Sequence, residues 1–328
     1  MRLREFIMVG GAAVAWPFAA RAQKKPTVPT VGILWHAGSA EEEAIFLSQI
    51  QDGLQALGYV EGRNIVLVNT FADEQYERFS SNAAELIRRE VDVLVAVSPP
   101  AAFAAQRATK TIPVVFVLVS DPVASKLVAS LAHPGGNITG LSNLTEDLLG
   151  KSLELFRQVV PRLSGITLMI NPSHDPLTAE LSVKQAQIAA QRLQLNFRSV
   201  EVQQPDQFAR VFSSPGDGTN GVVVNADGMF FRERKQIAEL ALKYKIPTSV
   251  FDPAMVEDGG LMTYAPDVKF IFRRSATYID KILKGTKPEE LPVELPTKFD
   301  FVINLKTAKT LGLDIPNSTQ MLADKVIE

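Results

Sequence analysis

Apolar and polar positions follow two recurring patterns along the chain. Short, nearly continuous apolar runs alternate with longer stretches in which apolar side chains recur at helical spacing. The run from Thr30 to Trp35 is followed by such a stretch at 41–57, where Ile45, Ile50 and Leu54 lie near one helix face. Continuous apolar runs are typical of strands buried on both faces, and amphipathic helices cover them. The order therefore predicts an α/β fold with parallel sheets.

The same alternation occurs twice. The turn-forming string Pro134-Gly-Gly-Asn137 precedes a joint near 140–142, and the pattern resumes at Lys151. The predicted strands are 30–35, 64–69, 91–97 and 114–119 before the joint and 165–170, 196–200, 221–224 and 248–251 after it. The predicted helices are 41–57, 76–90, 101–109, 151–160, 177–193, 205–212 and 231–244. Two such series indicate two Rossmann-like lobes.

The C-terminal part is less regular. The pattern predicts strands at 261–264, 291–295 and 299–304, a long amphipathic helix at 268–284 and a short one at 306–312. One long helix is too little for a third domain, so we expect these pieces to be shared between the lobes. The predicted first lobe is 23–142 plus about 264–290, and the second is 143–263 plus about 291–328. Several crossings between lobes would form a hinge.

Residues 1–22 have the layout of a secretory signal peptide. Arg2 and Arg4 precede an apolar run over 6–20, and Ala20-Arg-Ala22 fits the cleavage pattern. The apolar run is shorter than the roughly 20 residues of a spanning helix. We therefore expect export to the periplasm, by the Sec or the Tat route. Cleavage would remove three Arg and one Glu, which changes the formal charge from −2 to −4.

Composition narrows the chemistry. Apolar residues make up 46% and charged residues 21%, as in globular proteins, and the near-neutral charge does not favour nucleic-acid binding. The absence of cysteine excludes disulfides, thiolate metal sites and a cysteine nucleophile. Three histidines argue against a histidine-rich metal centre. No nucleotide-binding glycine motif and no serine elbow follows a predicted strand. We therefore expect a protein that is not an enzyme and needs no cofactor or metal.

Polar and aromatic side chains follow the predicted strands, where open parallel sheets bind ligands. Serine hydroxyls at helix starts suit a carboxylate, acidic side chains suit an ammonium group, and aromatic rings suit an apolar body. Together they describe a site for an amino acid. The candidate ligand-binding residues are Trp35, His36, Ser98, Ser120, Asp121, Asn171, Asp227, Phe230, Phe251 and Tyr264.

Several candidates also have a purely structural interpretation. Ser98, Ser120 and Asp121 are good helix N-caps whatever the function, and Asp252, which precedes a proline, is another. Trp35 and Phe251 fit a hydrophobic core equally well, and His36 also suits a polar loop position. Phe230 and its neighbour Phe231 cannot both face a cleft, so at least one of them should belong to the core.

Several short sequence motifs, which occur in the same order along the whole chain as in a known family, indicate a resemblance to that family. They include Gly58-Tyr-Val-Glu-Gly-Arg-Asn64, Pro134-Gly-Gly-Asn-Ile-Thr-Gly140, Gly259-Gly-Leu-Met-Thr-Tyr264 and Phe301-Val-Ile-Asn-Leu-Lys-Thr-Ala308. With these the chain resembles ABC-transporter substrate-binding proteins whose characterised relatives bind tryptophan or other aromatic amino acids. The resemblance implies a type I periplasmic-binding-protein fold, two lobes joined by three crossings, and docking on membrane permease subunits.

The hypothesis favoured by the sequence is an exported carrier, monomeric by default, that captures an amino acid or a related small carboxylate by lobe closure. An exported enzyme on the same scaffold is one alternative, which turnover of the ligand would reveal. An effector-sensing domain of a regulator or receptor is another, and it would need a DNA-binding or membrane-spanning segment. The sequence shows neither segment.

Overall fold

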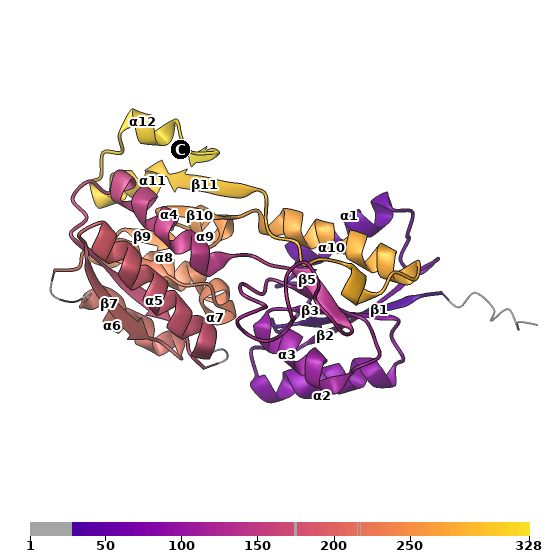
Figure 1. The fold of residues 1–328 in the computed structure, drawn as a ribbon. Coiled ribbons are helices and arrows are strands. Elements are labelled where there is room, and N and C mark those ends of the chain that lie inside the picture. Colours follow the sequence, from indigo (N-terminus) through magenta and orange to yellow (C-terminus); the bar gives the residue numbers. More distant parts are fainter. Residues whose placement is uncertain (1–27, 174–175, 215, 217) are drawn as a thin grey trace, which may run out of the picture.

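Two lobes lie side by side in the computed structural model, which describes residues 28–173, 176–214, 216 and 218–328 (Figure 1). The predicted signal peptide lies outside the described residues. The first lobe contains a five-stranded sheet in the order β2-β1-β3-β4-β5, and all neighbouring strands in it are parallel. Its strands are β1 (Thr30–Trp35), β2 (Val66–Phe71), β3 (Val93–Val97), β4 (Val114–Val117) and β5 (Ile138–Leu141). Its helices include α1 (Ala44–Ala56), α2 (Tyr76–Arg88) and α3 (Pro99–Ala108).

The second lobe contains a seven-stranded sheet in the order β12-β11-β10-β9-β8-β6-β7. Only the pair β10–β11 is antiparallel among the strand pairs of the described residues. Its strands are β6 (Gly165–Ile170), β7 (Asn196–Glu201), β8 (Gly221–Val224), β9 (Thr248–Val250), β10 (Met262–Pro266), β11 (Phe299–Asn304) and β12 (Lys325–Ile327). Its helices are α4 (Thr145–Val159), α5 (Pro176–Arg192), η1 (Pro205–Gln207), α6 (Phe208–Ser213), α7 (Gly228–Arg232), α8 (Arg234–Tyr244), α9 (Pro253–Glu257), α11 (Leu305–Leu311) and α12 (Asn317–Gln320).

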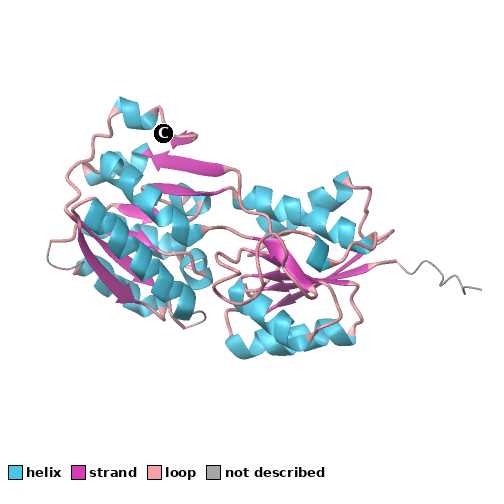
Figure 2. Ribbon diagram, in the orientation of Figure 1, coloured by secondary structure: helices cyan, strands magenta, loops and turns pink. Residues whose placement is uncertain are grey.

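Helices cover both faces of each sheet, which explains the continuous apolar runs (Figure 2). In β1, Val31, Ile33 and Trp35 enter one core cluster, and Leu34 enters the cluster on the opposite face. The two faces of the second sheet likewise carry separate clusters. The prediction of an α/β fold with two Rossmann-like lobes is confirmed. No helix in the described ranges is long and apolar enough to cross a membrane.

The chain passes between the lobes at three places within the described residues. It leaves the first lobe after β5, returns after β10 into α10 (Val268–Leu283), and leaves again before β11. Helix α10 packs on α1 closely enough that a Cβ at Gly53 would lie 2.5 Å from the carbonyl oxygen of Arg273. A three-segment connection is therefore present, as the resemblance implied.

The structure corrects several details of the sequence-based prediction. Strand β5 is not among the predicted strands, because Gly140 falls in the predicted joint. The strand needs this glycine, since a Cβ at position 140 would lie 2.1 Å from the carbonyl oxygen of Phe116 on β4. The expected strand 291–295 is only a single bridge from Glu294 to Leu141, and it follows the short helix η2 (Pro288–Glu290). Leu291 and Val293 belong to first-lobe clusters rather than to the second lobe. The expected helix 231–244 is two helices, α7 and α8.

Candidate functional site

The carboxyl ends of strands from both lobes face a cleft between the lobes. The second-lobe side is formed by the ends of β6, β8, β9 and β10, and the first-lobe side by the ends of β1 to β4 with α1 and α3. The lining residues are His36, Phe46, Glu74, Ser98, Pro99, Pro100, Leu118, Ser120, Asn143, Asn171, Thr178, Ala179, Asn225, Ala226, Asp227, Gly228, Phe231, Phe251, Asp252, Pro266 and Val268. Segments far apart in the sequence thus build one cleft.

Three half-buried phenylalanines give the cleft an aromatic wall. Phe46 comes from α1 in the first lobe, and Phe231 and Phe251 come from the second lobe. The ring centres of Phe46 and Phe231 are 6.1 Å apart, and those of Phe231 and Phe251 are 6.4 Å apart. Rings at these separations, contributed by both lobes, can enclose a flat apolar group.

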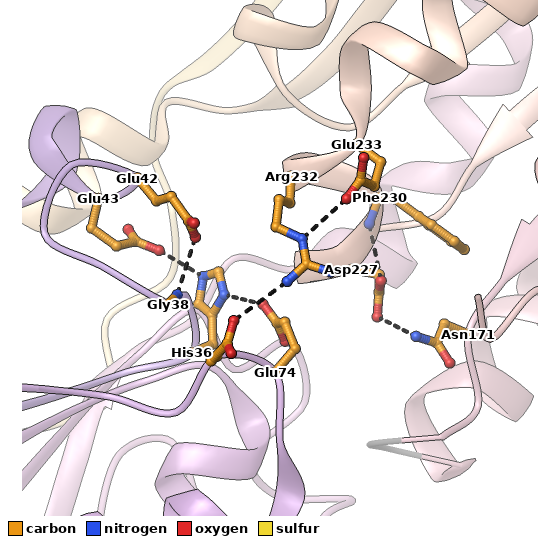
Figure 3. Close-up of polar contacts among 11 residues, drawn as sticks. His36, Gly38, Glu42, Glu43, Glu74, Asn171, Asp227, Phe230, Arg232 and Glu233 are labelled. Atoms are coloured by element: carbon orange, nitrogen blue, oxygen red, sulfur yellow. Dashed lines mark hydrogen bonds and ion pairs between the residues drawn. The ribbon is translucent and has the colours of Figure 1, made fainter. Parts of the chain in front are cut away.

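A histidine between two carboxylates lies on the first-lobe side (Figure 3). His36 Nδ1 is 2.7 Å from Glu74 Oε1, and His36 Nε2 is 3.2 Å from Glu43 Oε1. Burial alone would lower the pKa of His36, but the charges of Glu74 and Glu43 outweigh it and raise that pKa to about 10. The imidazole is therefore protonated at neutral pH, where it donates a hydrogen bond from Nδ1 to Glu74 and forms an ion pair through Nε2 with Glu43.

Two acidic side chains line the second-lobe side, and each caps a short helix. Asp227 caps α7 by accepting from the backbone N–H of Phe230 at 3.2 Å, and its other oxygen accepts from Asn171 Nδ2 at 3.1 Å. Asp252 caps α9 by accepting from the backbone N–H of Ala254 at 2.7 Å. Burial raises the pKa of Asp252 to about 6. The capping interpretation of Asp252 thus holds together with a place in the cleft.

Three neutral polar groups of the cleft are buried without a hydrogen-bond partner. Among the residues that the structure describes, these atoms are Ser98 Oγ, Asn143 Oδ1 and Asn225 Oδ1. Ser98 also has a φ of 90°, which is uncommon for a residue other than glycine. A buried polar atom without a partner costs about 1–3 kcal/mol. A bound ligand that hydrogen-bonds to these atoms would remove that cost.

Six of the ten sequence candidates lie in the cleft lining, and four do not. The six are His36, Ser98, Ser120, Asn171, Asp227 and Phe251. Tyr264 instead stacks on Phe299, with ring centres 5.9 Å apart, and lines a smaller neighbouring pocket of the second lobe. Asp121 is exposed and accepts from the backbone N–H groups of Val123 and Ala124, but the residues after it form turns and not a helix, so its interpretation as a helix cap is wrong.

The two remaining candidates are core residues. Trp35 is fully buried and stacks on Phe272, while its Nε1 donates to Asn69 Oδ1 at 2.8 Å. It is the last residue of β1 and faces α10, so the next residue, His36, is the one that reaches the cleft. Phe230 is also fully buried and packs edge-on against Phe208. Its neighbour Phe231 faces the cleft instead.

Glu74, Phe46 and Asn143 line the cleft but are not among the sequence candidates. Glu74 was missed because the second strand was predicted at 64–69, whereas β2 runs from Val66 to Phe71 and ends closer to it. Phe46 lies on a helix face rather than at a strand end, and Asn143 lies in a crossing between lobes. The polar loop after β2 was a usable signal for Glu74. The described residues contain no group of three or more His, Asp or Glu that could hold a metal ion.

Comparison with known proteins gives matches over most of the chain. Residues 40–327 match the sequence model of the family described as ABC transporter substrate binding protein. The tyrosine-binding protein of Clostridioides difficile is 26% identical over 262 residues, which cover 79% of this chain and 74% of that protein. A conserved domain protein from Vibrio cholerae has a TM-score of 0.85 and 26% identity, over 92% of this chain and 100% of that one.

Two further structures differ in ligand state. An ABC domain from Streptococcus pneumonia in complex with L-Trp has a TM-score of 0.85 at 25% identity, and the match covers 92% of this chain and 100% of that one. A ligand-free, open substrate-binding protein with adhesive properties from Clostridium difficile has a TM-score of 0.69 at 24% identity, over 92% and 99% of the two chains. The overall fold is thus shared with these solved structures.

Proposed function

This chain belongs to the ABC transporter substrate-binding protein family, and from that premise we propose that its cleft captures an aromatic amino acid or a closely related small carboxylate. The observation that carries this proposal is the set of three phenylalanine rings, from both lobes, beside buried acidic and unpartnered polar groups. The similarity to a tyrosine-binding protein and to a structure in complex with L-Trp is consistent with it.

We assign the two ends of the amino acid to different parts of the cleft. The ammonium group suits the carboxylate of Asp227 and the unpartnered oxygen of Asn225, both of which can accept hydrogen bonds. The carboxylate suits the hydroxyl of Ser98, whose oxygen is buried in the cleft without a hydrogen-bond partner. The helix starts in the lining offer less, because α3 begins with two prolines that lack N–H groups and the first turn of α10 is already capped by the carboxylate of Asp267.

Capture by lobe closure follows from this division. A ligand bound to one lobe completes its contacts only when the other lobe arrives, since the rings and polar groups come from both. Closure then buries the ligand and changes the surface that a permease meets. We propose that the protein works in the periplasm, delivers its ligand to the permease subunits of an ABC importer, and releases that ligand chemically unchanged.

A thermal-shift screen tests this proposal. The chain from Gln23 onward would be heated with L-tryptophan, L-tyrosine and L-phenylalanine, and with L-alanine as the control that lacks a ring. Ligand at a hundred times Kd stabilises the folded protein by about 2.7 kcal/mol, so at least one aromatic amino acid should raise Tm while L-alanine should not. No shift with any of the three would contradict the proposal. Chromatography of the recovered ligand would reveal any turnover.

A further inference from the structure

The turn after β2 is held rigidly against the end of β1. Asp73 and Glu74 have φ angles of 52° and 54°, in the left-handed region that residues other than glycine seldom adopt. The backbone N–H of Asp73 donates to the carbonyl of Ala37 at 3.0 Å, and that of Glu74 donates to the carbonyl of His36 at 2.8 Å. These bonds fix where both acidic side chains are presented.

The carboxylate of Glu74 is fixed as well as its backbone. His36 Nδ1 lies 2.7 Å from it, and Glu43 holds the other side of the imidazole ring. The side chains of Glu74 and His36 are only 14% and 16% exposed. A Glu74 side chain that swings away would therefore break a short charged hydrogen bond in a poorly hydrated place.

Across the cleft, the second lobe meets this turn at α7 (Figure 3). A Cβ at Gly228 would lie 1.9 Å from Glu74 Oε1 and 2.6 Å from Glu74 Cδ, so the carboxylate rests directly on the glycine. One turn further along α7, Arg232 Nη1 lies 3.6 Å from Asp73 Oδ1. The first helix turn after the cleft residue Asp227 is thus the part of the second lobe that touches the Asp73-Glu74 turn.

We propose that Glu74 and Gly228 form an inter-lobe latch, in which the absence of a side chain at position 228 admits the Glu74 carboxylate and allows the lobes to close fully. The Arg232–Asp73 pair flanks the latch. This inference rests on the proposed capture by lobe closure, because the latch acts on the closed state alone. Glu74 and Gly228 are then positioning residues that set how long a ligand stays bound.

A double-mutant cycle tests the latch. Gly228→Ala would be made in the natural chain and in Glu74→Ala, and L-tryptophan and L-tyrosine binding would be measured by calorimetry and by the rate of release. In the natural chain the added methyl group collides with the held carboxylate, so we expect affinity to fall about tenfold or more, mostly through faster release. With Glu74→Ala the same methyl group has room, and we expect a change of less than about threefold.

The matched control is Gly150→Ala. A Cβ at Gly150 on α4 meets nothing within 4 Å, so this variant should bind as the natural chain does. Thermal unfolding of each variant would show that both lobes remain folded. An equal loss of affinity from Gly228→Ala with and without Glu74, or no loss at all, would overturn the latch.

A second experiment needs no ligand. Since the chain has no cysteine, the pair Glu74→Cys and Gly228→Cys would carry the only two thiols, and a disulfide needs Cβ atoms about 3.5–4.5 Å apart. We expect oxidised glutathione to close this disulfide within one chain, and not to close it in the control pair Glu74→Cys and Gly150→Cys. If neither amino acid binds, the proposed function fails while the cross-link still decides the latch. A 74–228 pair that does not cross-link any faster than the control would overturn it.

Discussion

The side chains of the cleft owe their properties to their immediate neighbours. His36 follows a strand and would titrate near its ordinary pKa if exposed, but two carboxylates hold its proton. Asp252 shows the opposite environment, because burial favours its neutral form and raises its pKa. One cleft therefore holds a stabilised cation and a destabilised anion, which residue type alone does not reveal.

The first prediction concerns pH and His36. The pKa of His36 is about 10 in the folded protein, against 6.5 for an unperturbed histidine, so the folded state binds more protons between these values. Its contribution to stability is complete below pH 6.5 and is lost as pH rises toward 10. We expect the free energy of unfolding to fall by at least about 1 kcal/mol between about pH 7 and pH 10 on this account.

Denaturant unfolding at several pH values would measure this decline. His36→Gln cannot gain a proton, so its unfolding free energy should be lower than that of the natural chain at neutral pH but should decline less as pH rises. Parallel pH profiles for the two proteins would show that His36 is not protonated in the folded state.

The second prediction compares neighbouring phenylalanines. Phe230 is fully buried and Phe231 lines the cleft. Phe230→Ala should lower the free energy of unfolding by about 3–5 kcal/mol, the usual cost of truncating a core phenylalanine. Phe231→Ala should cost much less stability and should weaken binding of L-tryptophan about tenfold. Unfolding and calorimetry on both variants would check this, and equal destabilisation by the two substitutions would argue against the assigned cleft face.

At the scale of elements, much of the fold could be predicted from sequence. The apolar runs at 30–35, 165–170 and 221–224 coincide with β1, β6 and β8 because strands buried on both faces leave an unmistakable pattern. Strand β5 was not predicted because its short run falls at the predicted joint between the lobes, although packing against Phe116 requires Gly140 there. Leu291 and Val293 have the alternating spacing of a strand, yet they pack into the first-lobe core without forming a strand.

The candidate site was predictable in kind but not in detail. Three of the residues predicted from strand ends, His36, Ser98 and Asp227, line the cleft, because parallel sheets gather these ends at one edge. Successive side chains along a strand point in opposite directions, so a shift of one residue decides which of two neighbours faces the cleft. For this reason Trp35 belongs to the core while His36 lines the cleft. Contacts between lobes, such as Glu74 against Gly228, depend on how the two lobes are oriented, and the pattern of apolar and polar residues does not predict that orientation.

At the scale of the whole molecule, the three crossings connect two independent cores. Each sheet has core clusters on both faces, so each lobe has its own hydrophobic support. The contacts across the cleft are few by comparison and include the Arg232–Asp73 pair and the Phe46–Phe231 rings. An arrangement of two stable cores with a light interface suits a carrier that opens and closes without unfolding.

The central claim is that the cleft between the lobes binds an aromatic amino acid, and isothermal titration calorimetry tests it most directly. L-tryptophan, L-tyrosine and L-alanine would be titrated into the chain from Gln23 onward. The account predicts saturable binding of an aromatic amino acid at one site per chain, a negative heat-capacity change from burial of the ring, and no binding of L-alanine. Absence of binding by both aromatic amino acids, or equal binding of L-alanine, would contradict it.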